Sequence, residues 1–350
     1  MSKALKKIGV IGHFGFGETL SNGQTVKTKI VTEALDERYS PDEVMKEDTH
    51  GGIKALARLP FQIIRALRRA ENILIIPAQR GVRVTAPLLT LFNRFYRRRL
   101  HYCVIGGWLP GLIKDKKALT KQLRSFNALY VETHVVEKAL NAMGFDNVFA
   151  VPNCKPLKPT DISRLNIDFG EPYRLCTFSR VMREKGIEDA VNAVSAVNES
   201  CGRTVFSLDI FGQVDSSQTQ WFDDLKKSFP DHIRYMGVVP YDKSVETLEG
   251  YFALLFPTRF YTEGIPGTVI DAYAAGVPVI SSRWESFSDI ITDGVTGLGY
   301  DFGDYADLVR VLSDIADSPE GLIAMKPDCV RRAEDYLPQN ALKALFEQID

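Results

Sequence analysis

Cysteine is scarce in this chain, with five residues among 350, and no Cys-x-x-Cys pair occurs. Neither a zinc ribbon nor a disulfide framework is therefore indicated, and a reducing cytoplasm is the simplest compartment. No run of 18 apolar residues is present, so no transmembrane helix is expected. The N-terminal stretch lacks the apolar region and cleavage site of a signal peptide, which again favours the cytoplasm.

Patterns typical of metal sites are missing as well. The five histidines, at positions 13, 50, 101, 134 and 232, show no ligand spacing. No Asp-x-Asp pair is available to hold Mg²⁺ against phosphate groups. We therefore expect no metal requirement and no cofactor.

Charge is nearly balanced overall but unevenly distributed. The net charge is −1, whereas residues 54–124 hold 16 Lys and Arg against only Glu71 and Asp115. The cations alternate with apolar residues in Phe61–Arg69 and Leu88–Arg99, as in basic amphipathic helices at anionic membranes. Each cation near such a surface contributes about 1 kcal/mol. A membrane surface is the favoured partner, a plain solvated face is the alternative, and no nucleic acid is expected because no RNA-binding signature accompanies the charge.

Short apolar segments alternate with amphipathic ones along the whole chain. Strands are predicted at Lys7–Gly12, Asn72–Pro77, His101–Ile105, Ala128–Glu132, Val148–Val151, Arg174–Ser179, Val205–Phe211, Ile233–Gly237, Tyr251–Phe256 and Val277–Ser281. Helices are predicted from a Ser21–Gln24 loop to about Leu35, at Ile53–Arg69 (interrupted or kinked near Pro60), Pro87–Arg99, after Glu132 to Met143, Lys185–Glu199, Trp221–Phe229, Ser244–Gly250, Gly267–Ala275 and Asn340–Gln348. This alternation predicts an α/β protein with two doubly wound parallel sheets, whose ligands bind at the edge where the strands end.

A chain of 350 residues suits two domains. A polar, proline-rich stretch beginning at Lys155 places the linker within residues 153–171. We expect an N-terminal domain over residues 1–160, a C-terminal domain over 161–330 and a final helix in 331–350 that packs back on the first domain.

The most informative segment is 262–283. Glu263 precedes a Gly-Ile-Pro-Gly turn, Asp271 stands eight positions later in a small-residue helix, and a Gly-Val-Pro break leads to a strand. Free N–H groups at a helix start bind anions, and the two carboxylates can accept hydrogen bonds from hydroxyls on either side. Phosphate flanked by hydroxyls describes a nucleoside diphosphate sugar. The alternative is a helix whose dipole stabilises nearby acids, which explains Glu263 alone better than the joint pattern.

Two cations follow the strand predicted to end at Ser179. Arg180 lies at its carboxyl end and Lys185 at the start of the next helix. Fixed cations there can hold a diphosphate and neutralise the charge that grows on it as a leaving group. Two solvated surface cations are the alternative. We also expect Gly212, directly after another strand, among the donor-binding residues.

Glycines cluster around His13 after the first strand. His13, Gly15, Gly17, Gly23 and, further along, Gly107 are expected to line an acceptor-binding cleft. A dinucleotide site, and with it a dehydrogenase, is weakly supported because the Gly-x-Gly-x-x-Gly order is absent. For His13, a structural and a catalytic role remain equally open.

Over about residues 148–300 the sequence resembles the retaining GT-B glycosyltransferases of the GT4, or "glycosyl transferases group 1", family. The resemblance lies in Val151-Pro152-Asn153, in Phe178-Ser179-Arg180 through Lys185-Gly186, in Glu263 to Asp271 and in Asp293-Gly294-Val295-Thr296-Gly297. Asp271 stands where the family usually has Glu, Ser179 where it has Gly, and Gly106-Gly107-Trp108 where many members have a histidine.

The resemblance implies a site for each part of the donor. Arg180 and Lys185 would bind the diphosphate, Glu263 would contact the transferred sugar and Asp271 the ribose. The distal phosphate would meet the segment Gly264, Ile265, Pro266, Gly267 and Thr268. It also implies retention of anomeric configuration, by front-face attack assisted by the leaving phosphate.

These observations favour a metal-independent glycosyltransferase with two Rossmann-like domains facing a central cleft. It would move a sugar from a nucleotide-sugar donor to a glycan or lipid-linked acceptor in surface polysaccharide synthesis, at the inner face of the cell membrane. A GT-B sugar-nucleotide epimerase and a noncatalytic nucleotide-sugar-binding protein are the alternatives. The intact set of Arg180, Lys185 and Glu263 argues against the second.

Overall fold

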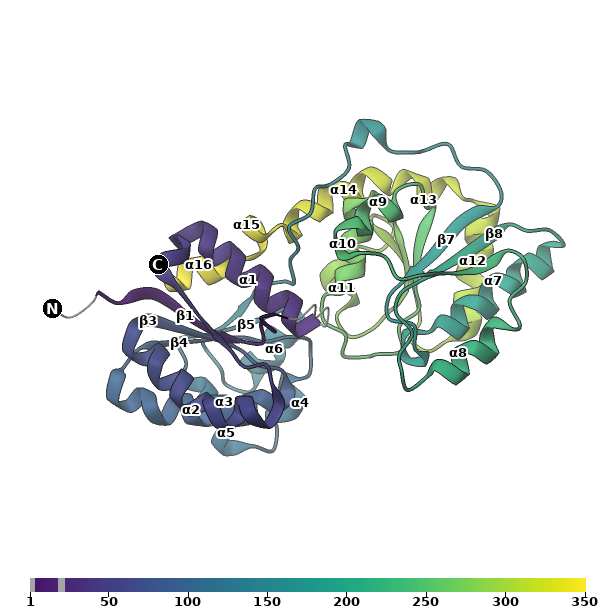
Figure 1. Cartoon of the computed structure of the whole chain (residues 1–350). Coiled ribbons are helices and arrows are strands. Elements are labelled where there is room, and N and C mark those ends of the chain that lie inside the picture. Colours follow the sequence, from purple (N-terminus) through teal and green to yellow (C-terminus); the bar gives the residue numbers. More distant parts are fainter. Residues whose placement is uncertain (1–3, 18–22) are drawn as a thin grey trace. The chain divides into compact units, whose positions relative to one another are not determined.

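The computed structural model describes residues 4–17 and 23–350 (Figure 1), so the predicted loop residues Ser21 and Asn22 lie outside the described residues. Two compact units are formed, unit 1 from Met1–Pro156 with Leu337–Asp350 and unit 2 from Leu157–Tyr336. The chain passes from unit 1 to unit 2 after Pro156, inside the predicted linker. It returns to unit 1 after Tyr336 rather than after residue 330, because Ala333 and Tyr336 are buried in the core of unit 2. Among the described residues, we find no helix with both the length and the apolar character needed to span a membrane.

Unit 1 contains a six-stranded parallel sheet in the order β2-β1-β3-β4-β5-β6. Its strands are β1 Lys6–Gly12, β2 Val44–Asp48, β3 Ala70–Ile76, β4 Arg99–Cys103, β5 Ala128–Val131 and β6 Val148–Ala150. Strand β2 was not predicted, because Lys46, Glu47 and Asp48 break its apolar pattern. The structure accounts for two of these charges, since Lys46 pairs with Asp36 and Glu47 with Arg65.

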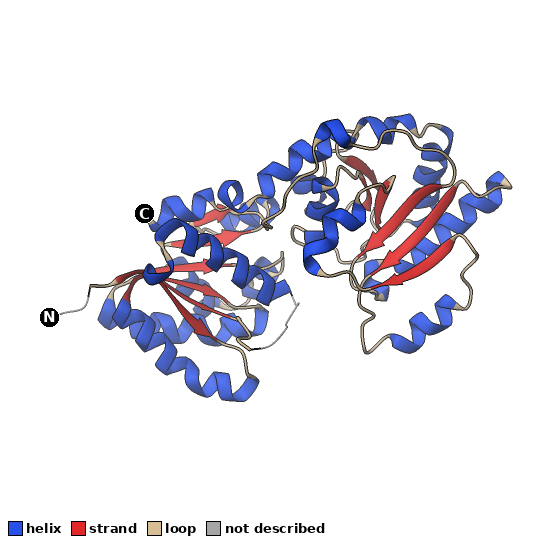
Figure 2. Cartoon of the chain, turned by 45° about the horizontal axis from the view of Figure 1, so that its top comes forward, coloured by secondary structure: helices blue, strands red, loops and turns tan. Residues whose placement is uncertain are grey.

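The helices of unit 1 cover both faces of this sheet (Figure 2). They are α1 Gly23–Tyr39, α2 Gly52–Arg69, α3 Gln79–Tyr96, α4 Leu109–Ile113, α5 Lys117–Arg124 and α6 His134–Ala142. The core of one face draws on α2 to α6, and that of the other on α1 and the C-terminal segment. Helix α2 runs through Pro60 without interruption. One prediction was wrong in detail, because α3 begins at Gln79 rather than at Pro87, which lies inside it.

The C-terminal segment completes the second face of unit 1. The single helix expected at Asn340–Gln348 is two short helices, α15 Pro338–Ala341 and α16 Lys343–Ile349. Leu345 and Ile349 are fully buried in the same core as Leu35 of α1. Asp350 accepts hydrogen bonds from Arg38 at 2.7 Å and from the Tyr39 hydroxyl at 2.5 Å.

Unit 2 contains a second six-stranded parallel sheet, in the order β12-β11-β10-β7-β8-β9. Its strands are β7 Tyr173–Phe178, β8 Phe206–Phe211, β9 Ile233–Gly237, β10 Ala253–Phe256, β11 Val279–Ser282 and β12 Gly297–Tyr300. Its helices are α7 Ile187–Cys201, α8 Thr219–Lys226, α9 Ser244–Leu248, α10 Gly267–Ala274, α11 Phe287–Ile290, α12 Tyr305–Asp317, α13 Glu320–Ala324 and α14 Lys326–Ala333. The predicted α/β class with two doubly wound parallel sheets is confirmed.

Chain order reverses within each sheet, at β1 in unit 1 and at β7 in unit 2. In open parallel sheets, ligands bind at such switch points, beyond the carboxyl ends of the strands. In unit 2 the switch lies between β7 and β10, whose following loops carry Lys185 and Glu263. In unit 1 it lies between β1 and β3.

Candidate functional site

The centre of the candidate site in unit 2 is an ion pair between Lys185 and Glu263. Lys185 ends the short 3₁₀ helix Arg183–Lys185, and its Nζ lies 2.6 Å from Oε2 of Glu263. The two side chains are only 15% and 20% exposed. The hydroxyl of Thr258 donates to the same carboxylate oxygen at 3.2 Å. Because solvent is largely excluded here, water screens each of the two charges only weakly. Each charge can therefore interact strongly with a charged or polar group of a ligand.

Glycine at position 186 makes this pairing possible. Its φ is +69°, and a Cβ at this position would lie 1.9 Å from the carbonyl oxygen of Pro257. The loop after β7 therefore packs directly on the loop after β10. Aromatic rings complete the surroundings of the Lys185 ammonium, which lies 5.4 Å from the ring centre of Phe256 and 5.1 Å from that of Phe260.

The start of α10 follows immediately after Glu263. Its N-cap is Pro266, and neither a side-chain cap nor an acidic residue in the first turn is present in this described helix. The first N–H groups of a helix have no partner inside it. Gly264, Ile265 and Pro266 are buried, whereas Gly267 and Thr268 are half-buried.

Thr268 carries an unusual feature at this helix start. Its Oγ1 is buried and has no hydrogen-bond partner among the described residues. A buried hydroxyl without a partner costs free energy, and most buried polar groups in native proteins are paired. A ligand with acceptor oxygens can satisfy both this hydroxyl and the nearby amides.

Asp271 lies one turn further along α10. Its side chain is buried, with 3% of the residue exposed, and its carbonyl accepts the N–H of Ala275 at 3.0 Å.

Arg180 lies on the loop after β7, beside the loop after β8. It is more exposed than Lys185, at 56%, and its guanidinium lies 3.6 Å from Asp215. Hydrogen bonds from the hydroxyl and amide of Ser217 lower the pKa of Asp215, which keeps this partner ionised. Gly212 explains how the two loops meet, since a Cβ there would lie 1.8 Å from the carbonyl oxygen of Ser179.

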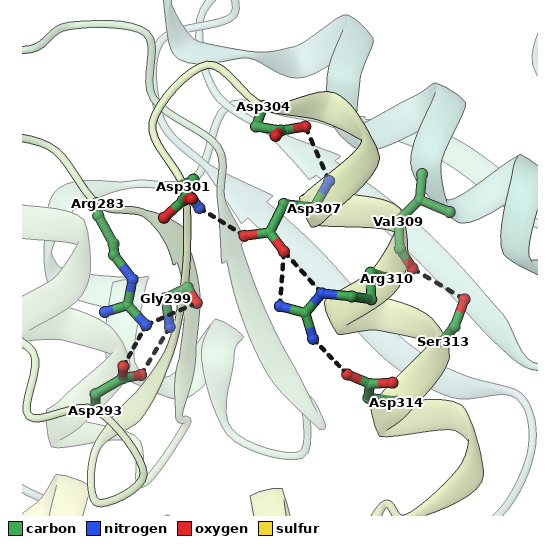
Figure 3. A network of polar contacts seen from close by, with 10 residues as sticks. All are labelled: Arg283, Asp293, Gly299, Asp301, Asp304, Asp307, Val309, Arg310, Ser313 and Asp314. Carbon is green, nitrogen blue, oxygen red and sulfur yellow. Dashed lines mark hydrogen bonds and ion pairs between the residues drawn. The ribbon is translucent and has the colours of Figure 1, made fainter.

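The Asp293–Gly297 segment forms the turn before β12 (Figure 3). Asp293 pairs with Arg283 and accepts the N–H of Gly299 at 2.9 Å. A Cβ on Gly297 would lie 2.1 Å from the carbonyl oxygen of Val279. These contacts give the motif a structural role in joining β12 to β11.

In unit 1, residues at the ends of β1, β2 and β3 surround a cavity of about 590 Å³. Of the predicted acceptor residues, His13 lines it, whereas Gly15, Gly17, Gly23 and Gly107 are not among its lining residues. Gly107 is buried between β4 and α4.

His13 belongs to a chain of polar contacts in unit 1. Its Nδ1 lies 2.7 Å from the Thr25 hydroxyl, and its Nε2 lies 3.0 Å from Nδ1 of His50. Sequence reasoning missed His50, because it follows the unpredicted strand β2.

Asp48, at the end of β2, fixes the glycine-rich loop after β1. Its carboxylate accepts the N–H groups of Phe14, Gly15 and Phe16 at 2.9, 3.2 and 3.0 Å. Burial raises the pKa of Asp48, but these bonds and that from the His50 amide outweigh burial and lower it. The glycines thus let the backbone wrap around an anionic side chain of the protein itself.

No group of three or more His, Cys, Asp or Glu side chains that could hold a metal ion is found within residues 4–17 and 23–350. The candidate site in unit 2 is therefore described by its cations, its carboxylates and one helix start.

Comparison with known proteins places this geometry in context. Residues 172–318 match the sequence model of the family described as glycosyl transferases group 1. The amylovoran biosynthesis glycosyltransferase AmsK of Erwinia amylovora is 23% identical over 187 residues, which cover 51% of this chain and 46% of that protein. The chain thus matches less than half the length of this curated relative.

Solved structures resemble the chain over nearly all of its length. The crystal structure of Anabaena Alr3699/HepE in complex with UDP and glucose has a TM-score of 0.73 at 12% identity and covers 99% of both chains. Sucrose-phosphate synthase from Thermosynechococcus elongatus has a TM-score of 0.75 at 14% identity and covers 98% of both. The chain therefore has the fold of GT-B glycosyltransferases, and its residues 172–318 match the glycosyl transferases group 1 model.

Proposed function

We propose that this protein is a glycosyltransferase that moves a sugar from a nucleoside-diphosphate donor bound in unit 2 to a glycan or lipid-linked acceptor bound in unit 1. The observation that supports it most is the shielded pair of Lys185 and Glu263 beside the uncapped start of α10. These groups lie at one edge of the sheet and match the parts of a sugar diphosphate. The cation and the free amides suit the phosphates, and the carboxylate suits the sugar hydroxyls. The family match over 172–318 covers all three.

Each donor-binding residue has a distinct task in this proposal. The Lys185 ammonium and the Arg180 guanidinium neutralise the diphosphate as it leaves. The amides of Gly267 and Thr268 and the Thr268 hydroxyl bind the distal phosphate. The Glu263 carboxylate orients the sugar through its hydroxyls, and Asp271 accepts from the ribose.

The proposal includes retention of anomeric configuration and independence from metal. Two protein cations and a helix start supply the positive charge that a divalent ion supplies elsewhere. Transfer in the presence of EDTA tests this point. An unchanged rate supports it, and a loss of rate restored by Mg²⁺ or Mn²⁺ contradicts it. The anomeric protons of donor and product, compared by NMR, test retention.

Surface polysaccharide synthesis is the proposed setting. AmsK is an amylovoran biosynthesis glycosyltransferase, and its similarity covers half of this chain. The acceptor then comes from a growing glycan or its lipid carrier.

The decisive experiment is a donor screen followed by a transfer assay. A donor that binds only the native state raises the melting temperature, and UDP-glucose is the first to test. Glu263→Gln and Lys185→Met should each lower kcat/KM at least about a hundredfold, which corresponds to about 3 kcal/mol. Arg183→Met is the matched control in the same 3₁₀ helix, because Arg183 pairs with Glu188 rather than with Glu263. Donor conversion without any acceptor would instead identify an epimerase, and donor binding without any turnover a binding protein.

We further propose that the basic face of α2 and α3 associates with the anionic inner face of the cell membrane. Phe61 of α2 and Phe95 of α3 are 76% and 83% exposed on helices rich in arginine. Apolar groups and cations on one helical surface are typical of interfacial binding. Phe61→Asn with Phe95→Asn should weaken binding to phosphatidylglycerol vesicles in a flotation assay. Ile167→Asn, which alters a 64% exposed residue of unit 2, is the control. Equal flotation of all variants would contradict the proposal.

A further inference from the structure

The cavity in unit 1 has a lining that identifies a class of ligand. Its volume of about 590 Å³ lies in the range of small-molecule sites. Much of the wall is apolar, and it comes from the ends of three strands and the first turns of two helices. The apolar lining residues are Ile11, Ala55, Leu56, Leu59, Pro77, Ala78 and Val84.

This wall is poorly suited to a free glycan. Carboxylates are frequent partners of sugar hydroxyls, yet no Asp or Glu is among the residues that line the cavity, and the amide of Gln24 in the lining already donates to the Ile76 carbonyl at 3.1 Å. Leu56 and Val84 line it while being 52% and 37% exposed, so the apolar wall reaches the protein surface. A ligand with an apolar chain can enter there and bury these groups from water.

Part of the cavity lining is suited to an anion. Arg80 is the permanently charged side chain of the lining, it is exposed, and it forms no ion pair with a described residue. The first residues of α2 and α3, Gly52 and Arg80 among them, also line the cavity. Both helices are 18 residues long, and neither has an acidic residue in its first turn or a capping side chain. Two helix starts and a cation in one cavity together favour a negative charge.

The paired histidines give the cavity further hydrogen-bonding groups. His13 and His50 both line the cavity and contact each other at 3.0 Å. Thr25 and the carboxylate of Asp48, which accepts the His50 amide at 2.9 Å, hold this arrangement in place.

We propose that the cavity binds an amphiphilic phosphate, with the apolar chain against Leu56, Leu59 and Val84 and the phosphate at Arg80 and the starts of α2 and α3. This inference rests on the proposed function, because it selects the lipid-linked phosphate over the free glycan as the acceptor class. The transfer reaction alone does not require any particular acceptor structure. The cavity lining does, because it requires an acceptor that carries an apolar hydrocarbon chain and a phosphate in one molecule.

Binding of farnesyl phosphate, measured by isothermal titration calorimetry below its micellar concentration and without donor, tests the inference. Farnesyl phosphate should bind at least about tenfold more tightly than farnesol, and inorganic phosphate alone should bind weakly. The charged hydrogen bonds from Arg80 and the helix starts to the phosphate are expected to supply this difference. Equal affinity for farnesol and farnesyl phosphate would overturn the proposal, and so would tight binding of inorganic phosphate alone.

Three variants separate cavity binding from general adsorption. Arg80→Gln should raise the Kd for farnesyl phosphate about tenfold, and Leu56→Asn should raise it as well. Phe95→Asn is the matched control, because Phe95 is an exposed apolar residue of α3 outside the cavity lining. A Kd that rises as much in the control as in Leu56→Asn would mean detergent-like adsorption and would refute the site.

The same titration with the wild-type protein distinguishes this inference from the proposed function. Farnesyl phosphate binding by a wild-type protein that transfers no sugar from any donor tested would support the cavity while the transferase proposal fails. Efficient transfer to a free glycan, with no farnesyl phosphate binding, would overturn the cavity and leave the transferase proposal standing.

Discussion

Gly186 and Pro257 are in such close contact that a Cβ on the glycine would lie 1.9 Å from the proline carbonyl oxygen. This contact joins the two loops that carry Lys185 and Glu263, residues 78 positions apart in the chain. The two ends of α7 provide a direct test, because both are glycines with positive φ, +69° at Gly186 and +64° at Gly202.

Gly186→Ala should therefore destabilise unit 2 considerably more than Gly202→Ala. A left-handed conformation costs alanine about 1 kcal/mol at either position. At Gly202 nothing lies within 4 Å of the added Cβ, so only this conformational cost applies. Urea denaturation measures both free energies of unfolding. Equal losses in the two variants would show that the Pro257 contact has no energetic weight.

Thr268→Val tests whether the unpaired hydroxyl at the start of α10 serves a ligand. In the free protein the substitution should leave the melting temperature unchanged or raise it, because a buried hydroxyl without a partner is removed. Binding of UDP should weaken about tenfold or more, because a hydrogen bond to a charged group is lost. Calorimetric titration of UDP into both proteins gives the comparison. Thr247→Val is a control on another helix, α9, where the hydroxyl donates to the Lys243 carbonyl at 2.7 Å.

The effects of replacing Lys27 and Glu132, a buried ion pair of unit 1, on the free energy of unfolding should be strongly coupled. The two side chains are only 5% and 6% exposed. Burial lowers the pKa of Lys27, but Glu132, together with Cys103 and Cys154, outweighs burial and the pKa is raised. Lys27→Met alone should cost about 3–5 kcal/mol, because it leaves a buried carboxylate without its partner.

The double variant Lys27→Met with Glu132→Met should recover most of that loss, because no unpaired charge remains. Chemical denaturation of the two single variants and the double variant measures the coupling. A single variant that loses less than about 1 kcal/mol would contradict the prediction.

Lys326 should make the stability of unit 2 depend on pH in the alkaline range. Its pKa is lowered from 10.5 to about 8 by burial, although its Nζ donates to the Tyr251 carbonyl at 3.1 Å. Between pH 8 and pH 10.5 the unfolded chain binds more protons at this lysine than the folded protein does. The contribution of Lys326 to the free energy of unfolding therefore rises with pH in this range. Below pH 8 the gain is absent, because the lysine is charged in both states.

Comparison with Lys326→Met isolates this contribution from other titrating groups. From pH 7 to pH 10, the wild type should gain up to about 3 kcal/mol relative to the variant. Thermal or urea unfolding at both pH values measures the difference, with the exposed Lys158→Met as control. A constant difference between wild type and Lys326→Met would show that the folded protein does not lower this pKa.

Sequence periodicity predicted most strands because parallel strands buried on both faces are continuous apolar runs. Strand β1, with the sequence KKIGVIG, is such a run. Strands β2 and β12 escaped this reasoning for physical reasons. Strand β2 contains three charged residues, which an edge strand with one neighbour can hold, so it is not an apolar run. Strand β12 contains two glycines, one of which, Gly297, packs against Val279, so its apolar pattern is also weak.

The candidate site was predictable where its chemistry is local in the chain. Glu263, the turn after it and Asp271 stand within nine consecutive positions, so their types and spacing carried the signal. The contribution of Thr258 was not predictable, because an isolated threonine has no distinguishing pattern. In unit 1, the cavity depends on residues from three strand ends and two helix starts, and its lining became visible only once β2 and the true start of α3 were known.

The placement of residues 337–350 in unit 1 has a consequence for synthesis. On the ribosome, unit 2 has all its residues once Tyr336 has emerged, whereas the sheet of unit 1 lacks part of its cover until Ile349 follows. The domain whose sequence starts first is therefore the last to be completed. Until then the apolar patch that Leu345 and Ile349 later occupy is open to solvent and available to a chaperone.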